Sequence, residues 1–274
     1  MISILILTLN EEQNISACLG SVAWSDDVIV LDSFSHDRTV PIARRAGARV
    51  FQRRFDDFAG QQNWALKNIK FKNSWVFYLD ADERMTEALR AELMAVASGD
   101  NRKVAYFCPR RNFFMGRWIK HCFPPIPVLR FFRPSKTRFK RVGHAPEPII
   151  RGDHGYLRES FDHYNFSKGF GDWFDKHNRY SHWEALEGFK ASELRGPSAS
   201  LWSSDPAERR KALKALFVKM PLRPLLKFAY LYLFKRGFLD GYPGFLYCVL
   251  QFFYELQIIL KIKEMEYRGK GLTL

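Results

Sequence analysis

Three nearly continuous apolar runs near the N-terminus constrain the fold most strongly. They read ISILILTL at 2–9, DVIVLDS at 27–33 and WVFYLDAD at 75–82. Strands that are covered by helices on both faces are apolar at nearly every position. The stretches that follow the first two runs, EEQNISACLGSVA and DRTVPIARRAG, have the composition of helices. Because strands alternate with helices, the sequence predicts a parallel α/β sheet.

Further elements continue this pattern. Gly47 is predicted to end the second helix, because glycine readily adopts the left-handed conformation of a helix C-terminus. A short strand is predicted at 48–55 and a helix at 60–69. From about 104 the sequence is rich in predicted strands, and after about 168 it becomes helical. The polar segment RGPSASLWSSDP at 195–206 is the predicted domain boundary.

Composition and charge narrow the choice of partners. The chain has 274 residues, with 43 Lys and Arg against 29 Asp and Glu, a net charge of +14. Such a balance favours phosphate-bearing partners, namely nucleic acid, anionic lipid or a nucleotide, without choosing among them. The 4 cysteines are far apart and form no CxxC pair, so we expect neither a zinc site nor a disulfide framework, and a reducing, cytoplasmic setting. The short apolar N-terminus is interpreted as a first strand rather than a signal peptide.

The C-terminal third is dominated by Leu, Phe and Tyr interspersed with basic residues. Its longest apolar span, 245–262, contains Glu255, which would cost about 2 to 3 kcal/mol in the middle of a bilayer. Arg223 and Lys227 share one helical face, so we predict helices that lie in an anionic membrane surface. The alternative is a buried helical hairpin or a dimer interface.

Polar side chains end each of the three apolar runs. In open parallel sheets, ligands bind at the carboxyl ends of the strands. Asp80 and Asp82 stand one residue apart there, so both carboxylates can turn toward one Mg²⁺ or Mn²⁺ ion. The alternative is that the two acids serve as turn or helix-capping residues. The other polar residues at these ends are Thr8, Asn10, Glu11, Asp32 and Ser33.

Four ordered motifs resemble the catalytic half of family 2 glycosyltransferases, which have the GT-A fold. They are ILILTLNEEQNISACLGSV, VIVLDSFSHDRTVPIARRAGARVF, FAGQQNWAL and WVFYLDADE. The resemblance is closest to bacterial enzymes that build lipopolysaccharide core and related surface glycans. It implies a nucleotide-sugar donor with UDP as carrier, an inverting mechanism and a divalent metal, Mg²⁺ or Mn²⁺. We therefore expect a GT-A catalytic domain at 1–195, with a nucleotide-sugar half at about 1–100 and an acceptor half at about 101–195, followed by an amphipathic, membrane-associating helical extension at 205–274.

The resemblance also assigns roles in donor binding. It implies that Thr8, Asn10 and Glu11 line the nucleoside pocket. Asp32 would accept a hydrogen bond from the base or ribose, although a helix N-cap explains it as well. Asp80 would face the ribose or uracil and help to hold the metal, and Asp82 would bind the metal directly. Gln62 and Asn63 match a position near the donor, although a polar helix face explains them equally well.

Direct displacement with inversion needs a base that takes the proton of the acceptor hydroxyl. Members of the family commonly carry a His-Glu pair after the second set of strands, whereas this chain has RVGHAPEPII. Glu147 is the candidate base, and His144 is an alternative base or orients the glutamate. An exposed loop acid is the other interpretation of Glu147.

Two further positions complete the expected site. His163 falls where the resemblance implies a histidine near metal or diphosphate, and a structural histidine is the alternative. Arg130 and Arg133 flank a Phe pair and are predicted to neutralise the diphosphate, unless they form a solvated strand edge.

Three functions follow from these expectations. The first is a glycosyltransferase at the cytoplasmic face of the inner membrane that moves a sugar to a lipid-linked saccharide. The second is transfer to a polyprenyl phosphate, which needs little base catalysis because that acceptor is already ionised. The third is a non-catalytic nucleic-acid-binding protein. The basic residues are scattered among Leu and Phe and no RNP aromatic motif is present, so we expect no nucleic-acid partner.

Overall fold

The computed structural model describes residues 1–99, 102–142, 145–193, 209, 220 and 222–274. The chain divides into two compact units. Unit 1 comprises Met1–Lys120 and Pro124–Gly169, and unit 2 comprises His121–Phe123 and Phe170–Leu274. The boundary predicted at 195–206 falls outside the described residues, so it stays a prediction.

Unit 1 is built on one large sheet, with strand order β3-β2-β1-β4-β8-β6-β12-β5. β1 is parallel to both of its neighbours, so that Ile4 lies between Val28 and Phe77, as the apolar runs predict. β8 is antiparallel to β4, which makes the sheet mixed. The strands of this order are β1 (Ser3–Thr8), β2 (Val28–Asp32), β3 (Arg49–Gln52), β4 (Val76–Asp80), β5 (Glu83–Arg84), β6 (Ala105–Phe114), β8 (Ile126–Phe132) and β12 (Phe161–His163).

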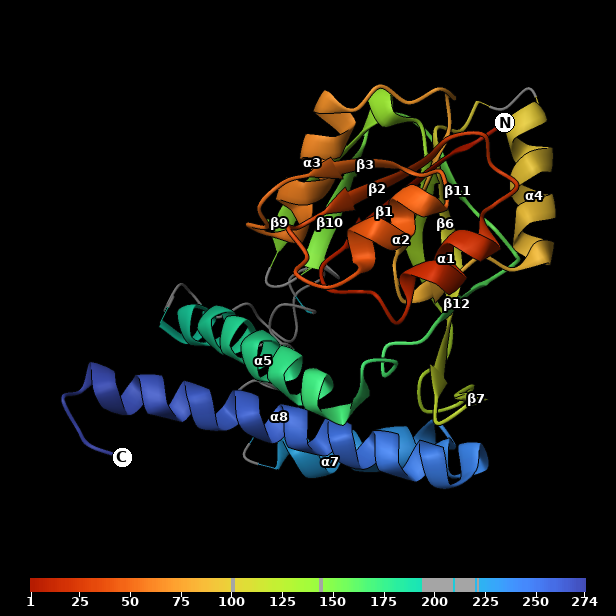
Figure 1. The fold of residues 1–274 in the computed structure, drawn as a ribbon. Coiled ribbons are helices and arrows are strands. Elements are labelled where there is room, and N and C mark those ends of the chain that lie inside the picture. The colour runs from red at the N-terminus through yellow and green to blue at the C-terminus, as the bar shows by residue number, and fades with distance from the viewer. Residues whose placement is uncertain (100–101, 143–144, 194–208, 210–219, 221) are drawn as a thin grey trace. The chain divides into compact units, whose positions relative to one another are not determined.

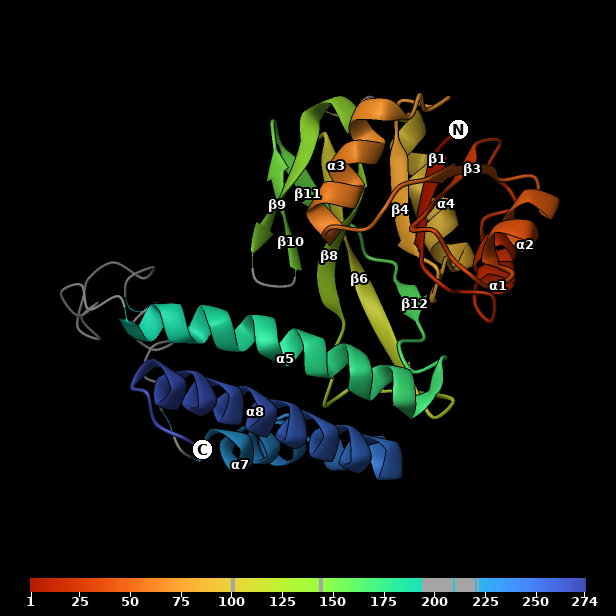
Figure 2. The ribbon, with the colours of Figure 1, turned by 60° about the vertical axis from the view of Figure 1, so that its left-hand side comes forward.

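Smaller strands flank this sheet. β7 (Arg117–Trp118) and β11 (His154–Tyr156) pair with β6. A single 3₁₀ turn, η1 (Pro134–Lys136), leads into a separate hairpin of β9 (Thr137–Val142) and β10 (Ala145–Ile150). Figure 2 shows β9 and β10 side by side, near α3.

Both faces of the sheet are covered, which explains why its central strands are apolar at nearly every position. Ile4 and Ile6 pack on one face with α1 (Ile15–Ser21), α2 (Thr39–Arg45) and α4 (Glu87–Ser98). Leu5 and Leu7 point to the other face, toward α3 (Phe58–Asn68) and β9. Figures 1 and 2 show α3 across the sheet from α1, α2 and α4.

The helices confirm most of the predicted elements, with one informative difference at the first helix. It begins at Ile15 rather than near Glu11, because the backbone N–H groups of Glu11 and Glu12 donate to Thr39 Oγ1 (2.7 Å) and Asp37 Oδ2 (3.0 Å). These bonds tie the loop after β1 to the loop after β2. Gly47 has φ +82° and ends α2 as predicted.

Unit 2 contains three α-helices in its described part: α5 (Gly169–Glu193), α7 (Arg223–Ala229) and α8 (Gly241–Gly269). Ala185 of α5 packs with Ile258 and Ile262 of α8. A π-helical turn, η2 (Tyr230–Phe234), and a 3₁₀ turn, η3 (Gly237–Asp240), connect α7 to α8. Among the described residues, Gly237–Gly269 is the one segment long and apolar enough to cross a membrane, since it contains a window of 18 residues with a mean hydropathy of 1.5.

Asp27 holds together the amino ends of the strands in unit 1. Its buried carboxylate accepts hydrogen bonds from Ser3 Oγ (2.5 Å), the Lys72 backbone N–H (2.8 Å) and the Arg49 guanidinium (2.8 Å). Burial raises the pKa of Asp27, but these bonds outweigh it and hold the pKa below the usual value of 3.8. Because the folded-state pKa is depressed, the stabilisation is present above pH 3.8 and is lost as the pH falls through the folded-state pKa.

Asp27→Asn should therefore lower the free energy of unfolding by about 1 to 3 kcal/mol at neutral pH. The difference from wild type should shrink below pH 3.8. Urea unfolding as a function of pH measures both effects. Asp26→Asn, at the exposed neighbouring position, is the control and should stay within about 0.5 kcal/mol of wild type. Equal losses for the two variants would contradict the role of Asp27.

Candidate active site

The three acids that crowd the end of β4 are separated in the structure. Glu83 is fully buried and receives a 2.6 Å hydrogen bond from Arg130, and it also accepts the backbone N–H of Asp80 at 2.9 Å. Asp80 receives a second bond from Arg130 (2.9 Å) and one from the Tyr78 hydroxyl. One cation from β8 thus neutralises two of the three carboxylates.

Arg130 is only 6% exposed, and its guanidinium stacks on the Tyr78 ring at 4.2 Å. Burial raises the pKa of Glu83 above the usual range of a carboxylic acid, and Arg130 counters part of that rise. Arg130 was predicted to contact the diphosphate. Because its guanidinium is bonded to Glu83 and Asp80, Arg130 is better suited to be a positioning residue that holds the end of β4.

Asp82 lies opposite His163. The two residues approach at 3.5 Å between Asp82 Oδ2 and His163 Nε2, and both side chains are largely buried. His163 Nδ1 lies 2.9 Å from the side-chain oxygen of Asn112, its register partner on β6. Because that oxygen can only accept, Nδ1 carries the proton and the lone pair of Nε2 points toward Asp82. Burial lowers the pKa of His163, which Asp82 partly opposes, and this favours the neutral ring.

A carboxylate oxygen and an imidazole lone pair that face each other are suited to hold a divalent cation. Such an ion usually keeps one or two protein ligands and takes the rest from phosphates and water. The described residues contain no group of three or more His, Cys, Asp or Glu arranged around one point, so the protein would supply only part of the coordination. Asp80, which was predicted to share the ion, is already bonded to Arg130 and Tyr78.

Two cations near this pair were not predicted. Arg110 lies two residues before Asn112 on β6, its charge lowers the pKa of His163, and its buried Nε–H has no hydrogen-bond partner. Lys168 pairs with Glu11 at 2.7 Å and donates to the Leu9 carbonyl. Burial raises the pKa of Glu11, and the charge of Asp82 adds to the rise. The sequence signal for Arg110 was its position two residues before Asn112 in the predicted strand CPRRNFF, which places the two side chains on the same face.

The polar residues after β1 and β2 bind one another. Asp32 is fully buried and accepts bonds from Thr8 Oγ1 (3.0 Å), the Ser35 backbone and hydroxyl, and Gln52 Nε2 (3.1 Å). Asn10, at φ +53°, accepts from the His36 N–H at 2.9 Å and donates its own N–H to Ser35 Oγ at 2.8 Å. These hydrogen bonds determine the conformation of the two loops. A contact between the Asp32 carboxylate and a nucleotide-sugar would compete with the four hydrogen bonds that Asp32 already accepts.

Two residues that were predicted to contact the donor are engaged in other contacts. The Asn63 amide is bonded through both of its polar atoms to the backbone of Phe139, at 2.7 and 2.9 Å, and so fastens β9 to α3. Arg133 stacks over Trp75 at 4.6 Å, next to the amino end of β4 and away from Asp80. Gln62 is buried, and its side-chain oxygen has no hydrogen-bond partner. Its neighbour Gln61, which was not predicted, reaches the end of β2 and donates to Ser33 Oγ at 2.8 Å.

Glu147 lies on β10, where it pairs with Lys140 of β9 at 3.1 Å and remains 52% exposed. The Glu147 carboxylate is therefore accessible from solvent although it is paired. His144, the alternative base, lies outside the described residues.

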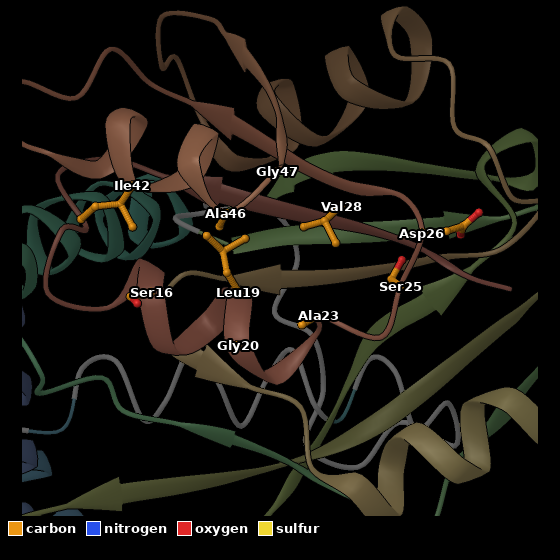
Figure 3. A pocket seen from close by; sticks show the side chains of 10 residues that line it. All are labelled: Ser16, Leu19, Gly20, Ala23, Ser25, Asp26, Val28, Ile42, Ala46 and Gly47. Atoms are coloured by element: carbon orange, nitrogen blue, oxygen red, sulfur yellow. The ribbon is translucent and has the colours of Figure 1, made fainter.

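A pocket of about 340 Å³ opens between α1, α2 and the start of β2, as Figure 3 shows. Its lining is made of small and apolar side chains such as Leu19, Ala23 and Ile42, and Asp26 is its one ionisable residue. It contains none of the predicted site residues, so we do not place the chemistry there.

Comparison with known proteins supplies the remaining evidence. Residues 3–164 match the model of glycosyl transferase family 2. An uncharacterized glycosyltransferase of Rickettsia typhi is 24% identical over 98% of this chain and 89% of its own length. The lipopolysaccharide core biosynthesis glycosyltransferase LpsC of Rhizobium meliloti is 30% identical over 54% of this chain and 57% of its own length. Among solved structures, S. aureus TarS (residues 1–349) is 14% identical, with a TM-score of 0.46 over 98% of this chain and 91% of that one.

Loss of the Arg130 cation should be costly, because it leaves the buried Glu83 and the partly exposed Asp80 without the cation that they share. Arg130→Met should lower the free energy of unfolding by about 3 to 5 kcal/mol. Adding Glu83→Gln should restore part of that loss, since the double variant has one fewer buried charge. Urea unfolding of the single and double variants measures this coupling.

Arg133→Met is the matched control, since that guanidinium stacks on a ring and should contribute only about 0.5 to 1 kcal/mol. Strictly additive effects of Arg130→Met and Glu83→Gln would contradict the network.

Proposed function

Because the chain belongs to glycosyl transferase family 2, and therefore has the GT-A fold, we propose that it transfers a sugar from a UDP-sugar to a lipid-linked saccharide of the bacterial surface. The juxtaposed Asp82 and His163 at the end of the sheet are the observation that carries the proposal. Family membership favours this enzyme over the nucleic-acid-binding alternative. The relative LpsC, named for lipopolysaccharide core biosynthesis, supports the acceptor class.

In the proposed donor site, the loops after β1 and β2 receive the nucleoside. Gln61 and Ser33 offer polar groups at the end of β2, and Glu11 and Thr8 do so at the end of β1. Asp82 and His163 would hold Mg²⁺ or Mn²⁺, whose charge would stabilise the departing diphosphate. Arg110, with its unpartnered N–H, would donate to a diphosphate oxygen.

Transfer with inversion requires the acceptor hydroxyl to attack from the face opposite the diphosphate. Glu147 would accept the hydroxyl proton as the oxygen–carbon bond forms and the bond to the diphosphate breaks. Glu147 pairs with Lys140 at 3.1 Å, and half of the surface of the Glu147 side chain stays accessible. We place this reaction at the cytoplasmic face of the inner membrane, reached through the apolar helices of unit 2, which the candidate span at Gly237–Gly269 supports.

Asp82→Asn should abolish the Mn²⁺ binding that we expect of the wild type in the presence of UDP. Asn112→Leu should weaken Mn²⁺ binding about 10- to 100-fold, because the imidazole loses the partner that orients it. Isothermal titration with Mn²⁺ in the presence of UDP measures both without turnover. The control is Asp162→Asn, which removes a neighbouring acid that pairs with Arg111 instead. Wild-type Mn²⁺ affinity in Asp82→Asn would refute the assignment.

Glu147→Gln should reduce turnover about 100- to 10,000-fold while UDP and Mn²⁺ binding persists. A sugar-transfer assay with a lipid-linked saccharide measures it, and Glu159→Gln, at another exposed position, is the control. An unchanged rate in Glu147→Gln would instead favour the second acceptor class, a polyprenyl phosphate, whose oxygen needs no base.

A further inference from the structure

The connection between α7 and α8 exposes an unusual apolar surface. Phe234 is 83% exposed, and Leu233, Phe238, Leu239 and Tyr242 are each about half exposed or more. We call these five residues the turn surface. Aromatic and aliphatic side chains in such a contiguous group normally mark an interaction site.

The backbone of this connection is firmly held, so the exposure is not that of a loose end. Asp240 is buried and accepts the backbone N–H groups of His121 and Cys122, each at 2.9 Å. Gly237 and Gly244 pack so closely that a side-chain carbon on Gly244 would lie 2.3 Å from the Gly237 carbonyl oxygen. The fold therefore presents the turn surface in a fixed conformation.

The charges around the turn surface are of one sign. Lys235 and Arg236 are exposed within it, and the one acid in residues 222–245 is the buried Asp240. An apolar surface with cations and no exposed acid is complementary to an anionic lipid headgroup layer. In a symmetric dimer built on this surface, the same cations would lie near their own copies without acids to pair with them.

α8 also carries polar side chains that argue against its crossing a membrane. Glu255 is buried between α8 and α7, where it pairs with Arg223 and lies 3.9 Å from Lys227. Gln257 and Lys261 bond to Ser181 of α5, at 3.2 and 2.8 Å. A spanning α8 would have to break these contacts and place Glu255 in hydrocarbon, whereas a helix that lies on the membrane keeps them.

We propose that the turn surface is a monotopic membrane anchor. Phe234 and its apolar neighbours insert below the headgroups of an anionic bilayer, and Lys235 and Arg236 bind the lipid phosphates. This inference rests on the proposed membrane location and not on the proposed sugar-transfer chemistry.

Vesicle flotation of the full chain tests the anchor. We expect binding to vesicles that contain phosphatidylglycerol, and much weaker binding to pure phosphatidylcholine. Phe234→Ser should lower the partition coefficient about tenfold. Lys235→Glu and Arg236→Gln should each lower it about fivefold or more, and high salt should remove the effect of charge. Leu274→Ser is the matched apolar control, because Leu274 is 81% exposed in the same unit, and Lys270→Glu is the charge control.

A second measurement reports insertion directly. All 4 cysteines of the chain are buried, so a cysteine introduced as Phe234→Cys can be labelled with an environment-sensitive fluorophore. Its emission should shift to the blue on anionic vesicles, and that of Leu274→Cys should not. No shift at position 234, or vesicle binding that Phe234→Ser leaves unchanged, would overturn the anchor. A dimer that Phe234→Ser dissociates, without change in vesicle binding, would also overturn it. Stabilisation by Mn²⁺ and UDP, measured on the same variants, reports separately on the proposed chemistry.

Discussion

The buried contact of Arg130 with Glu83 and Asp80 is the interaction on which the end of β4 depends. Three carboxylates within four positions would repel one another if all turned the same way. Arg130, delivered by the antiparallel neighbour β8, neutralises Glu83 and Asp80 inside the protein. Asp82 is thereby left on the other side of the chain, facing β12 and His163. A cation held by the fold thus determines which of the three acids faces His163.

Polar side chains also determine the conformation of the loops after β1 and β2. Asp32 and Asn10 tie the loops after β1 and β2 to each other, and Asn10 and Phe34 both take left-handed backbone conformations there. Such conformations cost about 1 to 3 kcal/mol for bulky residues and persist only where surrounding bonds enforce them. The conformation of the two loops is therefore held by hydrogen bonds between them.

The sequence predicted the parallel core well, because burial on both faces makes β1, β2 and β4 apolar at nearly every position. It also placed Asp82 and His163 in one site, through motif order. It failed where roles depend on pairing across the sheet. Arg130 and Arg133 look equivalent in LRFFRP, yet three residues along a strand span about 10 Å and reverse the side-chain direction. Likewise, the bond of Asn112 to His163 depends on a register between β6 and β12 that no local pattern encodes.

The short strand β12 determines when, during synthesis and folding, the side chains of the candidate site come together. The carboxylate, the amide and the imidazole come from residues 82, 112 and 163, and the latter two meet only when β12 pairs alongside β6. The early βα units can assemble during synthesis, but their end of the sheet lacks its imidazole until the ribosome has passed residue 163. A nascent or half-folded chain therefore lacks the Asp82–His163 pair, which forms only when β12 joins the sheet.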